Sequence, residues 1–146
     1  MYYRTDLSSY TETNYPKIKT IKSVKELQDY YENNKGIYQF HNGFGGEPSM
    51  ADAVFGSVTA YNADFFRTSY LLFVILGESS GSVRHRVESA VPESGSLSVS
   101  ITRIIPEIGT ADMAQWHIVL ELDKALSDLD VDVVIKDEPL ADSSSQ

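Results

Sequence analysis

The feature that most constrains the fold is the apolar run at residues 71–76, Leu-Leu-Phe-Val-Ile-Leu, the longest in the chain. Such a run is typical of a central strand that is covered on both faces. Downstream, apolar and polar residues alternate, which predicts strands with one solvent-exposed face. The alternating segments are 83–91, 97–105, 116–122 and 131–135. Because short turns such as Pro-Glu-Ser-Gly at 92–95 join them, we expect mainly antiparallel pairing.

The first half of the chain predicts helices. Ser23 and Glu26 form a capping box, in which the serine oxygen accepts a helix amide and the glutamate reaches back. Helical spacing of apolar residues follows, and Asn-Asn-Lys-Gly at 33–36 predicts the helix end. Further expected elements are an edge strand at 17–21, a brief strand at 37–40 and a second helix at 60–68. The fold class is therefore α+β: two N-terminal helices followed by a mainly antiparallel curled sheet or small β-sandwich.

The length of 146 residues suffices for one domain with its own core. We expect a flexible polar leader at 1–15, a single α+β domain at 16–138 and a disordered tail at 139–146. Four of the nine tyrosines lie in the leader: Tyr2, Tyr3, Tyr10 and Tyr15. Because tyrosine is common on contact surfaces, the leader either binds a partner or folds back over the domain.

Composition excludes several classes of function. The chain has no cysteine, which removes disulfides, thiol catalysis and cysteine-ligated metals but leaves the compartment open. Its 12 basic and 21 acidic side chains leave a net charge of −9, so we expect no nucleic-acid partner. No apolar run approaches the roughly 20 residues of a membrane helix, and no signal peptide is expected after Met1.

Acidic residues gather near the end of the chain. Asp128, Asp130 and Asp132 begin like a calcium loop, but the sixth position is valine and the twelfth is proline, so no calcium site is predicted. On an extended strand these carboxylates share one face. We expect them to stand across from Lys17 and Lys19 in a terminal strand pair.

Residues 77–81, Gly-Glu-Ser-Ser-Gly, fit the G-x-S-x-G spelling of a nucleophile elbow, with Ser79 as the nucleophile. An elbow requires a helix after the serine, whereas residues 83–87 alternate with the period of a strand. A hairpin turn made of small residues explains the segment better.

The three histidines show no spacing typical of a metal site. His85 lies on the inward face of its strand, where a half-buried, hydrogen-bonded side chain is expected. His117 lies on the face opposite Trp116, where we expect it to be solvated. His41 begins the glycine-rich loop 41–48 and is the best of the three catalytic candidates.

The glycine-rich loop does not predict a nucleotide site. A phosphate-binding loop continues with Gly-Lys-Ser/Thr, but here Glu47 and Pro48 follow the glycines. The glutamate would put negative charge where a phosphate would lie.

The chain resembles the C-terminal domain of the protease-complex-subunit (PrcB-like) family of bacterial surface proteins. The segments that carry the resemblance are Tyr-Asn-Ala-Asp-Phe-Phe at 61–66, the apolar run at 71–76 and Ser-Gly-Ser-Val-Arg-His-Arg-Val at 80–87. Residues 97–105 and 109–120 continue it, so the resemblance covers about residues 60–122. It implies an accessory domain without known catalytic residues, which assists a surface protease through protein contact.

We therefore expect a non-enzymatic accessory domain of a bacterial extracytoplasmic or envelope protein. Its partner would be another protein, such as a surface protease or an envelope component, and no catalytic, cofactor-binding or metal-binding residue is assigned. The alternative is a small hydrolase or ligand-binding protein that uses the glycine-rich loop, His41 and Ser79, and the alternative compartment is the cytoplasm. The sequence contains no recognisable motif that combines an acid, a base and a nucleophile, and this favours the accessory domain.

Overall fold

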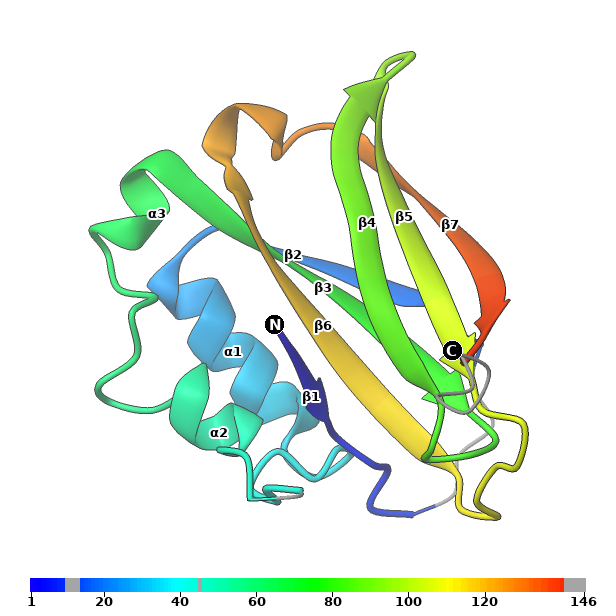
Figure 1. The fold of residues 1–146 in the computed structure, drawn as a ribbon. Helices are drawn as coiled ribbons and strands as arrows, with labels where there is room; N and C mark the ends of the chain where they lie inside the picture. Colours follow the sequence, from blue (N-terminus) through cyan, green and yellow to red (C-terminus); the bar gives the residue numbers. More distant parts are fainter. Residues whose placement is uncertain (10–13, 45, 141–146) are drawn as a thin grey trace. The chain divides into compact units, whose positions relative to one another are not determined.

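The computed structural model describes residues 1–9, 14–44 and 46–140 (Figure 1). These residues form three α-helices, one short 3-10 helix and seven strands in two mostly antiparallel sheets, which is the predicted α+β class. The sequence predicts one domain over residues 16–138, but the chain divides into two compact units. The first unit comprises Met1–Gly77 and Ala114–Ser127, and the second comprises Glu78–Met113 and Asp128–Gln146.

The first unit is built on a four-stranded sheet with the order β1-β6-β3-β2. Its strands are β1 (Tyr2–Arg4), β2 (Lys17–Ile21), β3 (Ser69–Glu78) and β6 (Ala114–Asp123). The apolar run 71–76 lies in β3, between β6 and β2, and each of its side chains is at most 3% exposed. The predicted central strand is therefore confirmed, as is the edge strand at 17–21, which pairs antiparallel to β3.

Helix α1 (Val24–Asn34) is the helix that the capping box predicts. Ser23 Oγ accepts a hydrogen bond from the Glu26 amide at 3.1 Å, and the Glu26 carboxylate accepts one from the Lys22 amide at 3.4 Å. Leu27 and Tyr30 form its buried side. Both belong to the core of the first unit, so α1 covers one face of the sheet.

The second predicted helix is wrong in extent. Of residues 60–68, only Phe65–Thr68 (α3) is helical. The residues before it form a turn, in which Asn62 Oδ1 accepts a hydrogen bond from the Phe65 amide. An unpredicted helix, α2 (Met50–Ala53), is capped by Ser49, whose Oγ accepts a hydrogen bond from the Asp52 amide. The brief strand predicted at 37–40 is reduced to one bridge, between Tyr38 and Leu7. The pair of N-terminal helices is thus one long helix and two single turns.

The core between α1 and the sheet is rich in aromatic rings. The ring centre of Tyr30 lies 5.1 Å from that of Phe73 on β3 and 6.1 Å from that of Phe40. Phe55 lies 5.0 Å from Phe40. Rings at these distances gain stabilisation beyond the area they bury. Much of the aromatic content therefore lies in this core.

The start of the chain folds back onto β6 instead of forming a loose leader. Tyr2 pairs with Ile118 and Arg4 with Trp116, so β1 extends the sheet by one short strand (Figure 1). Thr5 is fully buried, and its amide donates to the Gln115 carbonyl at 2.7 Å. Of the two interpretations of the leader tyrosines, folding back holds for residues 1–9, whereas Tyr10 lies outside the described residues.

The second unit is a three-stranded sheet with the order β4-β5-β7. Its strands are β4 (Arg84–Glu93), β5 (Ser96–Ile105) and β7 (Asp130–Pro139). The turn predicted at 92–95 is confirmed: Ser94 and Gly95 both have positive φ angles, of 53° and 85°, and join β4 to β5 as a tight hairpin. β7 pairs with β5 in parallel, which the alternation alone does not predict.

The pairing of Lys17 and Lys19 with Asp130 and Asp132 is wrong. β2 pairs with β3, and β7 pairs with β5, so the two segments belong to different sheets. Charge complementarity does not decide strand neighbours here, because apolar pairs such as buried Leu97 and half-buried Val131 set the register instead. Of the predicted tail, residues 141–146 lie outside the described residues.

Candidate functional site

The outer edge of β2 is the candidate binding edge of the first unit. β2 is the last strand of its sheet, and within the described part of the chain it is hydrogen-bonded to β3 alone. Alternate amide and carbonyl groups along the other edge of such a strand point away from the sheet and can pair with another strand. The strand is short, and its side chains are exposed from Lys17 to Lys19.

A groove of about 380 Å³ lies between β2 and α1. Its lining is polar: Lys19 contributes from β2, and Glu26, Asp29, Tyr30, Asn33 and Asn34 contribute from α1. The pairing with β3 explains why Lys19 faces the helix. Lys19 stands directly opposite Phe73, whose ring contacts Tyr30, so both side chains project to the α1 face of the sheet.

The carboxylates of this groove have partners within α1 and its cap, whereas the β2 lysines form no ion pair among the described residues. Asp29 forms an ion pair with Lys25 at 2.8 Å, and Glu26 is held in the N-terminal cap of α1. Among the described residues, no ion pair involves Lys17 or Lys19. The positive charge that this edge offers to a ligand is therefore that of Lys17 and Lys19.

The other outer edges are less suited to pairing. β1 has only three residues. β4 carries an irregularity between Val87 and Ser89 and a proline at position 92, two features that interrupt pairing along an edge. β7 carries Asp130, Asp132 and a terminal Pro139. A groove and a helix, by contrast, lie beside β2.

His41 is exposed, and its Nε2 lies 2.5 Å from the hydroxyl oxygen of Tyr31. In the glycine-rich loop that follows, Gly43 and Phe44 lie close to Glu47. A Cβ on Gly43 would clash with the Glu47 carbonyl oxygen, and the Glu47 amide donates to the Phe44 carbonyl. This close approach accounts for a glycine at position 43 without a ligand.

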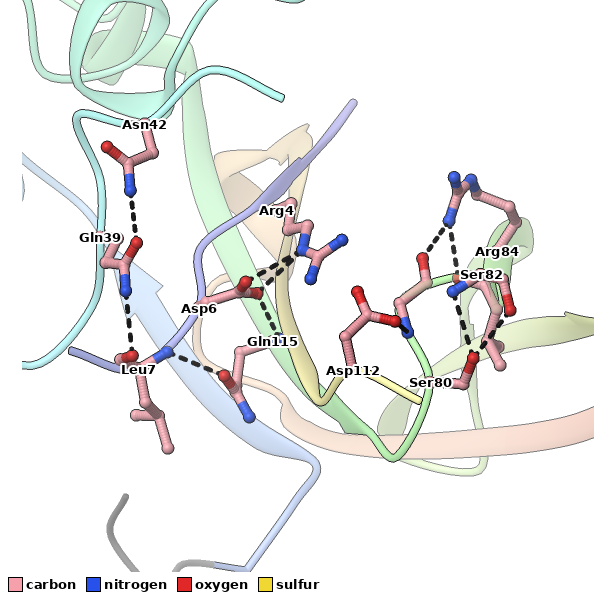
Figure 2. Close-up of polar contacts among 12 residues, drawn as sticks. Arg4, Asp6, Leu7, Gln39, Asn42, Ser80, Ser82, Arg84, Asp112 and Gln115 are labelled. Carbon is pink, nitrogen blue, oxygen red and sulfur yellow. Dashed lines mark hydrogen bonds and ion pairs between the residues drawn. The ribbon is translucent and has the colours of Figure 1, made fainter. Parts of the chain in front are cut away.

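Ser79 is exposed and lies between β3 and β4. A strand follows it, as its alternation predicts, so the helix that an elbow requires is missing. The predicted hairpin is nevertheless wrong, because β3 and β4 belong to different sheets. Ser80 Oγ lies 2.7 Å from Ser82 Oγ (Figure 2). The Gly81 amide donates to Asp112.

His85 is buried in an ionic cluster of the second unit. Its Nε2 lies 2.7 Å from Glu78 Oε2, and Arg103 donates to both oxygens of Glu78, at 2.9 and 2.6 Å. Burial alone would raise the pKa of Glu78, but the hydrogen bonds from Arg103 and His85 outweigh it and lower the pKa to about 2. A carboxylate with so low a pKa is a poor general base, so the cluster is suited to holding strands together.

His117 was expected to be solvated, and that expectation is wrong. The first six residues of β6 are all buried, so alternation fails there and both His117 and Trp116 are covered. The Nδ1 of His117 lies 2.6 Å from Thr5 Oγ1, and its Nε2 lies 2.6 Å from the Tyr30 hydroxyl. The imidazole therefore joins three segments of the first unit.

The segment that directly follows β1 is fixed by side-chain hydrogen bonds (Figure 2). Asp6 accepts from Arg4 Nε and from the Gln115 amide, and Gln115 Oε1 accepts from the Leu7 amide at 2.8 Å. Gln39 then donates to the Leu7 carbonyl at 3.1 Å. These polar groups satisfy one another, which suits a structural role.

Within the described residues, no three histidine, aspartate or glutamate side chains are grouped as metal ligands. Asp130 and Asp132 lie on the regular strand β7 and not in a loop.

None of the described helices has the length and apolar character needed to cross a bilayer. Comparison with protein-family models, curated proteins and solved structures finds no match to this chain.

Proposed function

We propose that this chain is a non-enzymatic accessory domain that binds another protein, and that it does so by adding an extended segment of the partner to the outer edge of β2. The observation that carries the proposal is the open edge of β2 beside the groove between β2 and α1. Main-chain hydrogen bonds to an open edge provide affinity, and a neighbouring groove receives alternate side chains of the added strand.

The resemblance of residues 60–122 to PrcB-like domains supports the same class of function. It would place the partner among surface proteases or envelope components and the chain outside the cytoplasm. The proposal does not depend on that placement, since an open edge beside a groove would bind an extended segment in any compartment.

The test uses the fact that the chain has no cysteine. Peptides are selected on the immobilised chain from a displayed library of random extended sequences. An Ile18→Cys variant carrying a photoreactive label is then compared with a Val58→Cys variant, because both positions belong to the first unit and are exposed, at 40% and 91%. We expect the selected peptides to cross-link at position 18 and not at position 58.

Hydrogen exchange supplies the second measurement. A strand added to β2 slows exchange of those β2 amides that point away from β3, and leaves the amides of β1 unchanged. Selected peptides that bind without slowing β2 exchange would contradict the proposal.

The hydrolase alternative is tested on the same protein. Turnover of a generic ester such as p-nitrophenyl acetate, lost in Ser79→Ala or His41→Ala, would favour it over an accessory domain. We expect no turnover above that of the buffer.

A further inference from the structure

The pairing between β2 and β3 sets which β2 side chains face the groove. Lys17, Lys19 and Ile21 stand opposite Ile75, Phe73 and Leu71, which belong to the core under α1. Since directly opposed residues of antiparallel strands project to the same face, Lys17 and Lys19 both lie on the α1 face. Ile18 projects to the opposite face and is 40% exposed.

A strand added to the open edge continues this alternation. Two of its side chains, separated by one residue, would lie beside Lys17 and Lys19, and the residue between them would lie beside Ile18. The groove provides space for the side chain beside Lys19, because Lys19 lines it.

We propose that the segment accepted by β2 is acidic and alternating, with carboxylates at positions i and i+2 and an apolar residue between them. This inference rests on the proposed function, because it names the chemistry of the partner at that same edge. It follows from the two uncompensated lysines on the groove side and from the exposed isoleucine on the other side.

The same lysines exclude other strands. Lysine on an edge strand disfavours a neighbour that carries like charge or an apolar side chain at the opposed position. The nearby carboxylates of α1 already have partners, since Asp29 is paired with Lys25 and Glu26 accepts hydrogen bonds in the helix cap.

The experiment compares designed peptides on the intact chain. The acidic peptide is acetyl-Thr-Glu-Val-Glu-Val-Thr-amide, and its neutral match carries glutamine in place of both glutamates. Binding is followed by fluorescence anisotropy at low salt and at high salt. We expect the acidic peptide to bind about 3- to 10-fold more tightly at low salt, as two cross-strand ion pairs provide. The difference should vanish at about 1 M salt, where exposed charges are screened.

Charge reversal identifies the residues responsible. The Lys17→Glu/Lys19→Glu variant should lose the preference and should bind a lysine version of the peptide more tightly instead. The matched control is Lys136→Glu, which reverses an exposed lysine on β7 and should leave the preference unchanged.

The outcomes separate the two proposals. Equal binding of the acidic and neutral peptides, with β2 amides protected by both, would overturn the acidic preference and leave strand addition standing. Failure of every peptide, selected or designed, to protect the β2 amides would overturn strand addition, and the acidic preference with it.

Discussion

The Nε2 atom of His117 lies 2.6 Å from the hydroxyl oxygen of Tyr30, and this hydrogen bond joins β6 to α1 within the core of the first unit. The other ring nitrogen bonds Thr5 at the same distance. Burial lowers the pKa of His117 to about 3, so the ring is neutral near pH 7. A neutral imidazole donates from one nitrogen and accepts at the other, and it therefore satisfies both hydroxyl groups.

Removing the Tyr30 hydroxyl should destabilise the protein. Tyr30→Phe leaves a buried ring nitrogen of His117 without its partner, which costs about 1–3 kcal/mol of unfolding free energy. The matched control is Tyr31→Phe, whose lost partner is the exposed His41, and we expect a change below about 0.5 kcal/mol. Urea unfolding at pH 7 measures both, and equal losses would contradict the prediction.

The same histidine should make the fold sensitive to mild acid. Its pKa is about 3 in the folded protein and about 6.5 in the unfolded chain, so protons bind the unfolded chain first. Above pH 6.5 the ring is neutral in both states and has no effect. As the pH falls from 6.5 toward 3, the unfolding free energy should decrease by about 1.4 kcal/mol per pH unit.

Denaturant titrations between pH 7 and pH 5 measure this slope, in a range where most carboxylates stay ionised. His117→Gln should flatten it, and His41→Gln is the control substitution at an exposed histidine. A slope that survives in His117→Gln would assign the acid sensitivity to another group.

Sequence patterns predicted the local elements well where one rule decides the outcome. Ser23 starts α1 because its side chain accepts a helix amide, and the turn at 92–95 forms because Gly95 tolerates a positive φ angle. The alternation rule failed for His117, because it assumes one solvent-exposed face and the first half of β6 has none. The strand β1 has only three residues, too few for any periodicity to reveal.

The candidate binding edge was only partly predictable. The sequence indicates an edge strand at 17–21, but which edge stays open depends on the order of the strands, and strand order is set by long-range packing. Charge suggested Asp130 and Asp132 as neighbours of Lys17 and Lys19. Burial of apolar side chains outweighs such exposed pairs, which contribute less than about 1 kcal/mol each.

Breaking the buried ionic cluster of the second unit should be costly. In Arg103→Met, the carboxylate of Glu78, which is 5% exposed, loses a bidentate partner, and we expect a loss of about 3–5 kcal/mol at pH 7. Arg86→Met is the control on the neighbouring strand. Its ion pairs with Glu88 and Glu138 are exposed, so its loss should stay below about 1 kcal/mol.

The double variant Glu78→Leu/Arg103→Met separates charge from packing. It removes the unpaired carboxylate, so it should be more stable than Arg103→Met alone. Thermal unfolding at pH 7 ranks the unchanged chain, Arg103→Met and the double variant. If the double variant is less stable than Arg103→Met, the loss of stability comes from packing around the two side chains and not from the unpaired carboxylate.

A pair of glycine substitutions tests how tightly the first unit is packed around Tyr15. A Cβ on Gly77 would lie 2.6 Å from Tyr15 Cδ2, so Gly77→Ala must displace the ring, and we expect a loss of about 1–3 kcal/mol. Gly36 follows α1 and has no atom within 4 Å of the added Cβ. Gly36→Ala should therefore stabilise the protein by about 0.4–1 kcal/mol, because it restricts the unfolded chain.

In a Tyr15→Ala background, adding Gly77→Ala should cost almost no further unfolding free energy. Chemical denaturation of the four variants measures these differences, and a full loss that persists without the Tyr15 ring would place the strain in the β3 backbone.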